Sequence, residues 1–221
     1  MDPAVRFARL IGGPPTPWAL DAACSLLSAG FTTRDRGEEV SARLDELAAA
    51  CQEPTLRGVL GTMRPHLSGN VEEYYDPRNS FIDVVLERGV GLPITLGVIA
   101  IEIGRRVGAP VVGIGPPRHF MVRDVAMGEF GDPFHGGMVY DRGEFRAAWD
   151  RLMGVEHPFD ELHLVPLSER AILIRMLTNL RALYVQRGDP RALWTLSIMR
   201  GSFVELVHEA PDHAQWMRFW N

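Results

Sequence analysis

Apolar residues recur every three to four positions in the first part of the chain, the spacing that turns one face of a helix toward a core. Gly30 and the stretch Gln52-Glu53-Pro54 interrupt this spacing. The pattern therefore predicts three helices, over residues 18–29, 37–51 and 55–63.

The stretch GLPITLGVIAIEIGRRVGAP predicts the central helix of the fold. Pro93 suits the first helical position, and Gly108 followed by Pro110 ends the helix. The many isoleucine and valine residues between them leave little polar surface, so we expect this helix to be buried on most sides. A polar loop, GNVEEYYDPRNSF, and a shorter helix over residues 81–87 precede it.

Short apolar runs after this helix predict an antiparallel sheet with strands over residues 111–115, 119–125 and 129–132. From Ser168 the pattern is helical again, and Gly188-Asp189-Pro190 separates two helices, the second running through Val207. The predicted fold class is α+β, with a central buried helix against an antiparallel sheet and helices at both ends. We assign residues 1–165 to one domain and residues 166–221 to a C-terminal helical hairpin that packs on it.

Composition narrows the class of protein. The 221 residues suit one medium domain, and 46% hydrophobic with 23% charged residues is typical of an ordered globular chain. The formal charge of -5 repels a phosphate backbone, so we expect no nucleic-acid partner. No apolar run of about 18 residues and no signal-peptide pattern occurs, which favours a cytoplasmic protein without a membrane partner.

The two cysteines, Cys24 and Cys51, are too few for a disulfide framework. Both continue apolar helical stripes, so we expect buried structural thiols. The histidines at positions 157, 163, 208 and 213 lack the spacing of a helical ligand pair, and we expect neither a metal nor another cofactor.

A hairpin between the second and third strands would bring His119 and Asp132 to one face of the sheet. Paired positions then sum to an odd number, which sets Asp132 opposite Met121 or Arg123. A carboxylate that orients an imidazole is the arrangement of Cys-His-Asp enzymes, and a structural His-Asp hydrogen bond is the alternative. Arg123 lies on the same face, where it would hold a ligand carboxylate or, more simply, pair with Asp132.

Several segments together resemble the transglutaminase-like superfamily, specifically its bacterial SirB-type branch, over residues 18–189. The resemblance implies that a catalytic cysteine begins the central helix and that His119 and Asp132 complete a triad. Counting back from Gly108 places the cysteine position at Pro93, where this chain has no thiol. The segments that carry the resemblance are LDAACSLLSAG, ARLDELAA, YYDPRNSFIDVVLERGVGLPITLGVIAIEIGRRVG, GIGPPRHFMVR, GDPFHGG and RMLTNLRALYVQRGD.

Two residues from the missing thiol position, Thr95 offers a hydroxyl that is expected to cap backbone donors, with a nucleophilic role as the alternative. The resemblance makes the DPRNSF loop a hallmark of the family. Its polar residues would either bind a ligand at the rim of the cleft or only satisfy the backbone of the loop. The candidate binding residues are Asp76, Asn79, Ser80, Pro93 and Arg123.

The favoured function is a non-enzymatic regulatory or binding protein, with a protein or peptide partner for a cleft that has lost its thiol chemistry. The C-terminal string NLRALYVQRGDPRAL resembles one tetratricopeptide unit and would assist such binding. The alternative is a hydrolase or acyltransferase for amide or ester bonds, with a His119-Asp132 dyad and Thr95 or water as attacker. A third interpretation is a scaffold that assembles through Trp216, Phe219 and Trp220.

Overall fold

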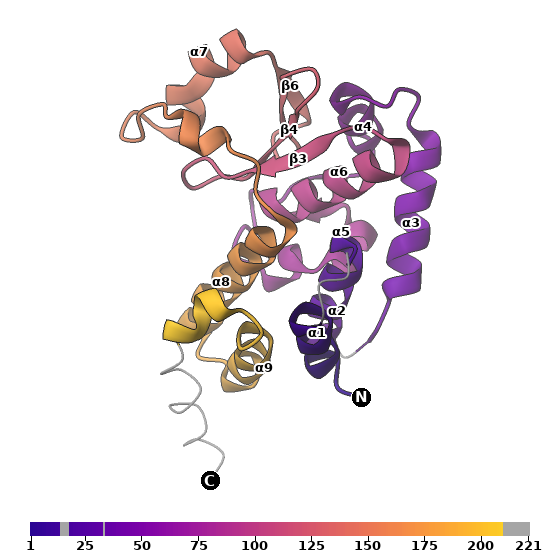
Figure 1. Ribbon diagram of the computed structural model, residues 1–221, viewed down its shortest axis with the longest axis vertical. Coiled ribbons are helices and arrows are strands. Elements are labelled where there is room, and N and C mark those ends of the chain that lie inside the picture. Colours follow the sequence, from indigo (N-terminus) through magenta and orange to yellow (C-terminus); the bar gives the residue numbers. More distant parts are fainter. Residues whose placement is uncertain (14–17, 33, 210–221) are drawn as a thin grey trace.

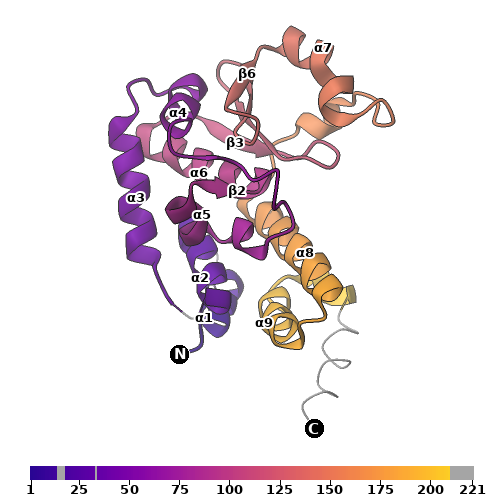
Figure 2. The ribbon, with the colours of Figure 1, turned by 180° about the vertical axis from the view of Figure 1, so that it is seen from behind.

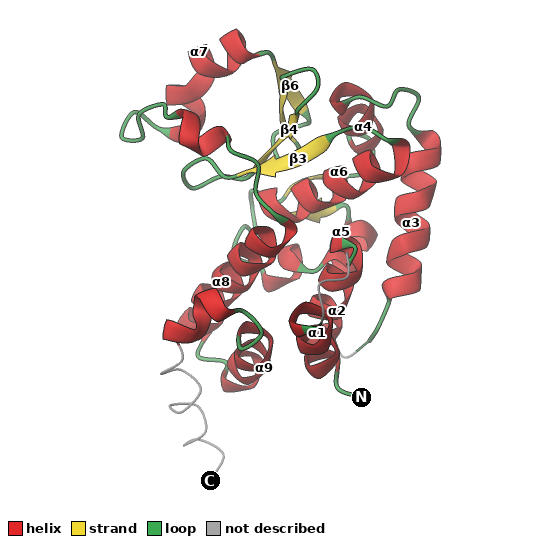
Figure 3. Ribbon diagram, viewed as in Figure 1, coloured by secondary structure: helices red, strands yellow, loops and turns green. Residues whose placement is uncertain are grey.

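The computed structural model of the chain describes residues 1–13, 18–32 and 34–209. Its architecture is α+β, and the strands are confined to a small part of a mostly helical molecule (Figure 3). The aromatic residues Trp216, Phe219 and Trp220 and the imidazole of His213 lie outside the described residues. None of the described helices combines the length and the apolar composition needed to cross a membrane.

The helices follow the predicted order, with two additions. Helices α1 and α7 were not predicted from the sequence, although the buried residues Phe145, Ala148, Trp149 and Met153 of α7 recur at helical spacing. The α-helices are α1 Pro3–Gly12, α2 Leu20–Thr32, α3 Gly37–Ala50, α4 Leu56–Met63, α5 Ile82–Arg88, α6 Pro93–Val107, α7 Arg142–Met153, α8 Glu169–Arg187 and α9 Pro190–Arg200. Short 3-10 helices cover η1 Pro77–Ser80, η2 Glu161–Leu164 and η3 Val204–Glu209.

Local side chains explain where several of these helices begin and end. Asp141 and Glu144 form a reciprocal capping box at the start of α7. Pro93 occupies the first turn of α6, as predicted, and Gly108 ends that helix in the left-handed conformation. The last long helix, α9, ends at Arg200 rather than at Val207, and the chain continues into η3.

The main sheet is a four-stranded antiparallel meander in the order β3-β4-β5-β6. Val122 pairs with Gly131 and Arg123 with Phe130, so paired positions sum to an odd number, as predicted for this hairpin. The fourth strand was not predicted from the sequence. The strands are β3 Val111–Ile114, β4 Met121–Asp124, β5 Phe130–Asp132 and β6 Met138–Tyr140, and a separate parallel pair joins β1 Ser68–Gly69 to β2 Val90–Gly91.

Helices α6 and α4 pack on one side of the sheet, α6 against β3 and β4 and α4 against β5 and β6, and α7 covers the opposite side (Figure 1). Helices α8 and α9 contribute to the same apolar core as α1, α2 and α6, and they lie beside α1 and α2 when the molecule is seen from behind (Figure 2). The C-terminal hairpin therefore packs on the core, while a domain boundary between residues 165 and 166 stays a prediction.

The two thiols differ in their surroundings. Cys24 is buried in α2, with its Sγ 3.8 Å from Sδ of Met176 in α8, and burial raises the pKa of this thiol above its ordinary range. Cys51 was expected to be buried, but it lies just after the end of α3 and is only half-buried, so that expectation was wrong.

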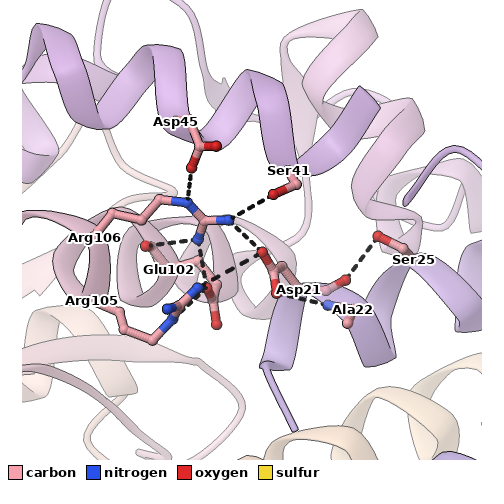
Figure 4. Close-up of polar contacts among 8 residues, drawn as sticks. All are labelled: Asp21, Ala22, Ser25, Ser41, Asp45, Glu102, Arg105 and Arg106. Carbon is pink, nitrogen blue, oxygen red and sulfur yellow. Dashed lines mark hydrogen bonds and ion pairs between the residues drawn. The ribbon is translucent and has the colours of Figure 1, made fainter. Parts of the chain in front are cut away.

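A buried ion network holds the C-terminal end of α6 (Figure 4). Glu102 is 1% exposed and accepts from Arg106 at 2.7 Å, and Arg106 also reaches Asp21 of α2 at 2.5 Å and Asp45 of α3 at 2.7 Å. Arg105 adds a contact to Glu102 at 2.8 Å. The guanidinium of Arg106 thus ties three helices together.

Substitution of Arg106 by Met should lower the free energy of unfolding by about 3–5 kcal/mol, because it removes the closest and most buried cation from the buried carboxylates of Glu102 and Asp21 and leaves them only the half-exposed Arg105. Urea unfolding followed by circular dichroism measures this loss. Arg43→Met is the matched control, since Arg43 forms an exposed pair with Glu46 and should cost less than about 1 kcal/mol. Equal effects of the two substitutions would contradict the role given to Arg106.

Candidate functional site

His119 and Asp132 meet at one end of the two inner strands, just before β4 begins and where β5 ends. Nε2 of His119 lies 2.9 Å from Oδ2 of Asp132, the last residue of β5. Arg118, directly before His119, has a φ of 58°, and this left-handed turn re-aims the chain just ahead of β4. The imidazole is 11% exposed and the carboxylate is fully buried.

Asp132 has a second imidazole partner, which the sequence analysis missed. Nδ1 of His135 lies 2.8 Å from the same oxygen, Oδ2, and the backbone N–H groups of Phe134 and His135 donate to Oδ1 at 3.0 and 3.1 Å. Burial would raise the pKa of Asp132, but the hydrogen bonds and charge of His119, followed by those of His135, outweigh it and hold that pKa below its usual range. The carboxylate is therefore ionised near neutral pH.

A cavity of about 280 Å³ opens beside His119, between the start of α6, the aromatic loop before η1 and one face of α8. Pro93 lies at the start of α6, Tyr74 in the loop and Arg175 on α8. The residues that line it are Tyr74, Tyr75, Leu92, Pro93, Ile94, Arg118, His119, Phe120, Arg175, Asn179, Ala182, Leu183 and Gln186.

Thr95 does not take part in this site. Its side chain is fully buried, it is absent from the cavity lining, and its Oγ1 has no hydrogen-bond partner among the described residues. Both expectations for Thr95 are corrected, because the hydroxyl neither caps the helix nor forms a hydrogen bond with His119. The start of α6 instead presents Pro93 and Ile94 to the cavity.

Arg123 also lies apart from Asp132. Its guanidinium donates to the backbone oxygen of Leu164 at 3.3 Å and lies over the ring of Phe130, 5.5 Å from the centroid. Among the described residues it forms no ion pair with Asp132, so the predicted pairing was wrong. The side chain turns toward the apolar cluster under α7 because that cluster offers the Phe130 ring and a free carbonyl.

The polar side chains of the DPRNSF loop contact residues within or next to the loop. Asp76 accepts from the backbone of Arg78 and pairs with the side chains of Arg78 and Arg88. Asn79 is fully buried and donates to the backbone oxygen of Glu73 at 2.7 Å, while its Oδ1 accepts from Asn70. Ser80 is buried as well. Asp76 and Asn79 thus shape the loop that carries Tyr74 and Tyr75, and the residues that line the cavity include none of the three candidates.

Arg175 is the residue of the cavity that sequence reasoning had no means to single out, since it is one of several arginines on helices. It donates to the backbone oxygen of His119 at 2.5 Å and lies 6.0 Å from the centroid of the Phe120 ring. Burial lowers the pKa of its guanidinium below the ordinary value, and none of the described residues forms an ion pair with it.

Substitution of Asp132 by Asn should lower the free energy of unfolding by about 1–3 kcal/mol at neutral pH, because two imidazoles and a buried turn lose their anion. The folded-state pKa of Asp132 lies below the unfolded value of about 3.9, so its charge stabilises the fold above that value. This contribution is lost as the pH falls through about 4 toward the folded-state pKa.

Urea unfolding of the wild type and Asp132→Asn at several pH values measures that difference. It should shrink as the pH falls below about 4. Asp150→Asn, at an exposed position of α7, is the control and should behave as the wild type does. A difference that widened at low pH would contradict the assigned direction of the shift.

Comparison with known proteins places this geometry in a family. The profile of the transglutaminase-like superfamily matches residues 34–178. A UPF0162 protein of Xylella fastidiosa strain Temecula1 is 46% identical over 122 residues, which cover 53% of this chain and 43% of that protein. A UPF0162 protein of Pseudomonas aeruginosa is 30% identical over 155 residues, covering 70% of this chain and 56% of that protein.

A more distant similarity reaches the mouse F-box only protein 21, 33% identical over 55 residues that cover 25% of this chain and 9% of that protein. The chain spans about half the length or less of the bacterial relatives named here. No solved structure matches the chain significantly. Since the profile covers well over half of the 221 residues, and the His119-Asp132 pair lies beside the start of a central helix, the chain belongs to the transglutaminase-like superfamily.

Proposed function

We propose that this protein is a non-enzymatic binding protein of a regulatory kind, and that its transglutaminase-like cleft recognises a peptide or protein segment. The observation that carries the proposal is the cavity beside His119, whose helical wall presents Pro93 and Ile94 where a thiol nucleophile would be needed. Within the superfamily we assign the chain to the SirB-type branch, with a tetratricopeptide-like C-terminal hairpin and a cytoplasmic location.

The walls of the cavity suit a short extended segment. Its volume of about 280 Å³ is close to the lower end of the roughly 300–1,000 Å³ range of ligand cavities. Tyr74, Tyr75 and Phe120 supply aromatic surface, which contributes much contact area at little cost in side-chain entropy. A side chain or a chain end of a partner fits this space, whereas a larger ligand would extend beyond it.

The charge of the cavity favours a carboxylate on that segment. Arg118 and Arg175 line it together with His119, and none of the described lining residues is acidic. Arg118 is exposed and lies 3.7 Å from Glu156, but Arg175 is half-buried and no described acid balances it. A guanidinium in this state gains most from an anionic partner, because its fork of donors matches a carboxylate.

Substitution of Arg175 by Gln should weaken the binding of a carboxylate-bearing peptide by at least about tenfold, because Gln keeps a donor for the His119 carbonyl but removes the charge. A peptide selected from a display library against the full chain provides the probe, and titration calorimetry measures its affinity. The peptide is tested as the free acid, as the C-terminal amide, and with Asp and Glu replaced by Asn and Gln, which identifies the carboxylate that matters.

Arg191→Gln is the matched control, since Arg191 is exposed on α9 and does not line the cavity. It should leave the affinity unchanged. Selected peptides that carry no carboxylate preference, or that bind Arg175→Gln as well as the wild type, would contradict the proposed recognition.

Hydrolysis or acyl transfer on amide or ester bonds is the second candidate function, because His119, oriented by Asp132, borders an open cavity. Because Thr95 does not line the cavity and forms no hydrogen bond with His119, an activated water is the attacker that remains for this mechanism. The binding proposal expects no turnover of chromogenic esters or peptide amides above the rate without protein. A turnover that His119→Ala abolishes, while circular dichroism shows an intact fold, would establish the enzyme instead.

A further inference from the structure

Three side chains near the end of β5 direct one potential ligand atom each toward a common point. Nε2 of His119 and Nδ1 of His135 lie 2.9 and 2.8 Å from Oδ2 of Asp132. The three atoms all lie within 4.8 Å of one another. In the described part of the chain, no other group of three or more His, Cys, Asp and Glu side chains converges in this way.

We infer that His119, Asp132 and His135 form a binding site for a divalent transition-metal ion of the zinc type. Two imidazole nitrogens and one carboxylate oxygen are a donor set that suits zinc and its neighbours in the first transition row. Magnesium and calcium prefer sites built from oxygen atoms alone. Three protein ligands leave one position of a tetrahedral ion open to water.

The carboxylate is already oriented for this role. Oδ1 of Asp132 is occupied by the backbone N–H groups of Phe134 and His135, so Oδ2 is the oxygen left for an ion. Hydrogen bonds of this kind behind a ligand fix its orientation and strengthen metal binding. Because Asp132 is 0% exposed, the folded chain alone determines where this oxygen points.

Coordination requires the two rings to move. Metal–ligand bonds of about 2.0–2.2 Å separate two donors of a tetrahedral ion by roughly 3.3 Å, so the N···O spacings of 2.8 and 2.9 Å would lengthen by a few tenths of an ångström, and the two ring nitrogens, now within 4.8 Å of each other, would adjust to the same separation. The side chain of His135 is 57% exposed, and the next two residues, Gly136 and Gly137, both have positive φ angles. The imidazole of His135 therefore has room to change its position. Its exposure also gives an ion a route from solvent.

The expectation of no metal came from sequence spacing on helices, which considers neither His119 nor His135. His135 follows Asp132 by three residues in a turn, and His119 approaches from the neighbouring strand. The inference does not depend on the proposed function, because an ion would bind here whether or not the cavity takes a peptide.

The test is a titration of the full chain, after removal of metal with a chelator, by Zn²⁺ in a calorimeter and by Co²⁺ in a visible spectrometer. One ion per chain is expected, and Co²⁺ should give the intense visible bands of a tetrahedral site. His135→Ala and Asp132→Asn should each weaken Zn²⁺ binding by at least about tenfold.

His66→Ala is the matched control, since His66 is an exposed histidine outside the cluster, and it should bind as the wild type does. Circular dichroism establishes that each variant is folded, and His135→Gln replaces His135→Ala if the latter is not. A wild type that binds no more tightly than the His135 variant would overturn the inference. The three side chains would then form a hydrogen-bonded cluster in which both imidazoles donate to one carboxylate.

Discussion

The structure depends on neutralising one carboxylate inside its central helix. Glu102 lies in α6 with 1% of its surface exposed, and burying an unpaired charge would cost several kcal/mol. Arg106, one turn further along, neutralises it and uses its remaining donors on Asp21 and Asp45. The positions of α2 and α3 against α6 are therefore set by charge as well as by apolar packing. The opposite end of α6 borders the cavity, and the residues that the structure describes form no such network there.

The two ends of α6 thus differ in how their charges are paired. At the C-terminal end, every charge has a partner, which fixes the helix in the core. At the N-terminal end, Pro93 starts the helix without a side-chain cap, and the cavity and Arg175 lie in front of it. Positive charge in front of a helix start is unfavourable within the free chain and favourable with an anion between them. The charges at the C-terminal end of α6 are paired within the chain, whereas the positive charge in front of its N-terminal end is available to a ligand.

Local signals were sufficient to predict most of the fold. The apolar stripe, Pro93 and Gly108 delimit α6, and period-two spacing sets the register that brings His119 to Asp132. The rest of the site depends on tertiary placement. His135 joins Asp132 through a turn, Arg175 arrives from a helix 56 residues after His119, and Arg123 turns to an aromatic ring instead of a carboxylate. No spacing rule within one segment contains the placements of Arg175 and Arg123, whereas the contact of His135 with Asp132, three residues earlier, is local.

The retained geometry also explains how a His-Asp pair persists without a thiol. Asp132 caps the turn after β5 through two backbone N–H groups and receives two imidazoles, so it contributes to folding whatever its chemistry. The absence of a nucleophile at Pro93 leaves the chain with two thiols remote from that role. Cys24 lies between α2 and α8, beside Met176, while Cys51 is partly open to solvent. Because Cys24 becomes reachable only when the core around α2 opens, its rate of alkylation relative to that of Cys51 reports how often this part of the core opens. The chain thus carries its own chemical reporter of local opening, independent of any ligand.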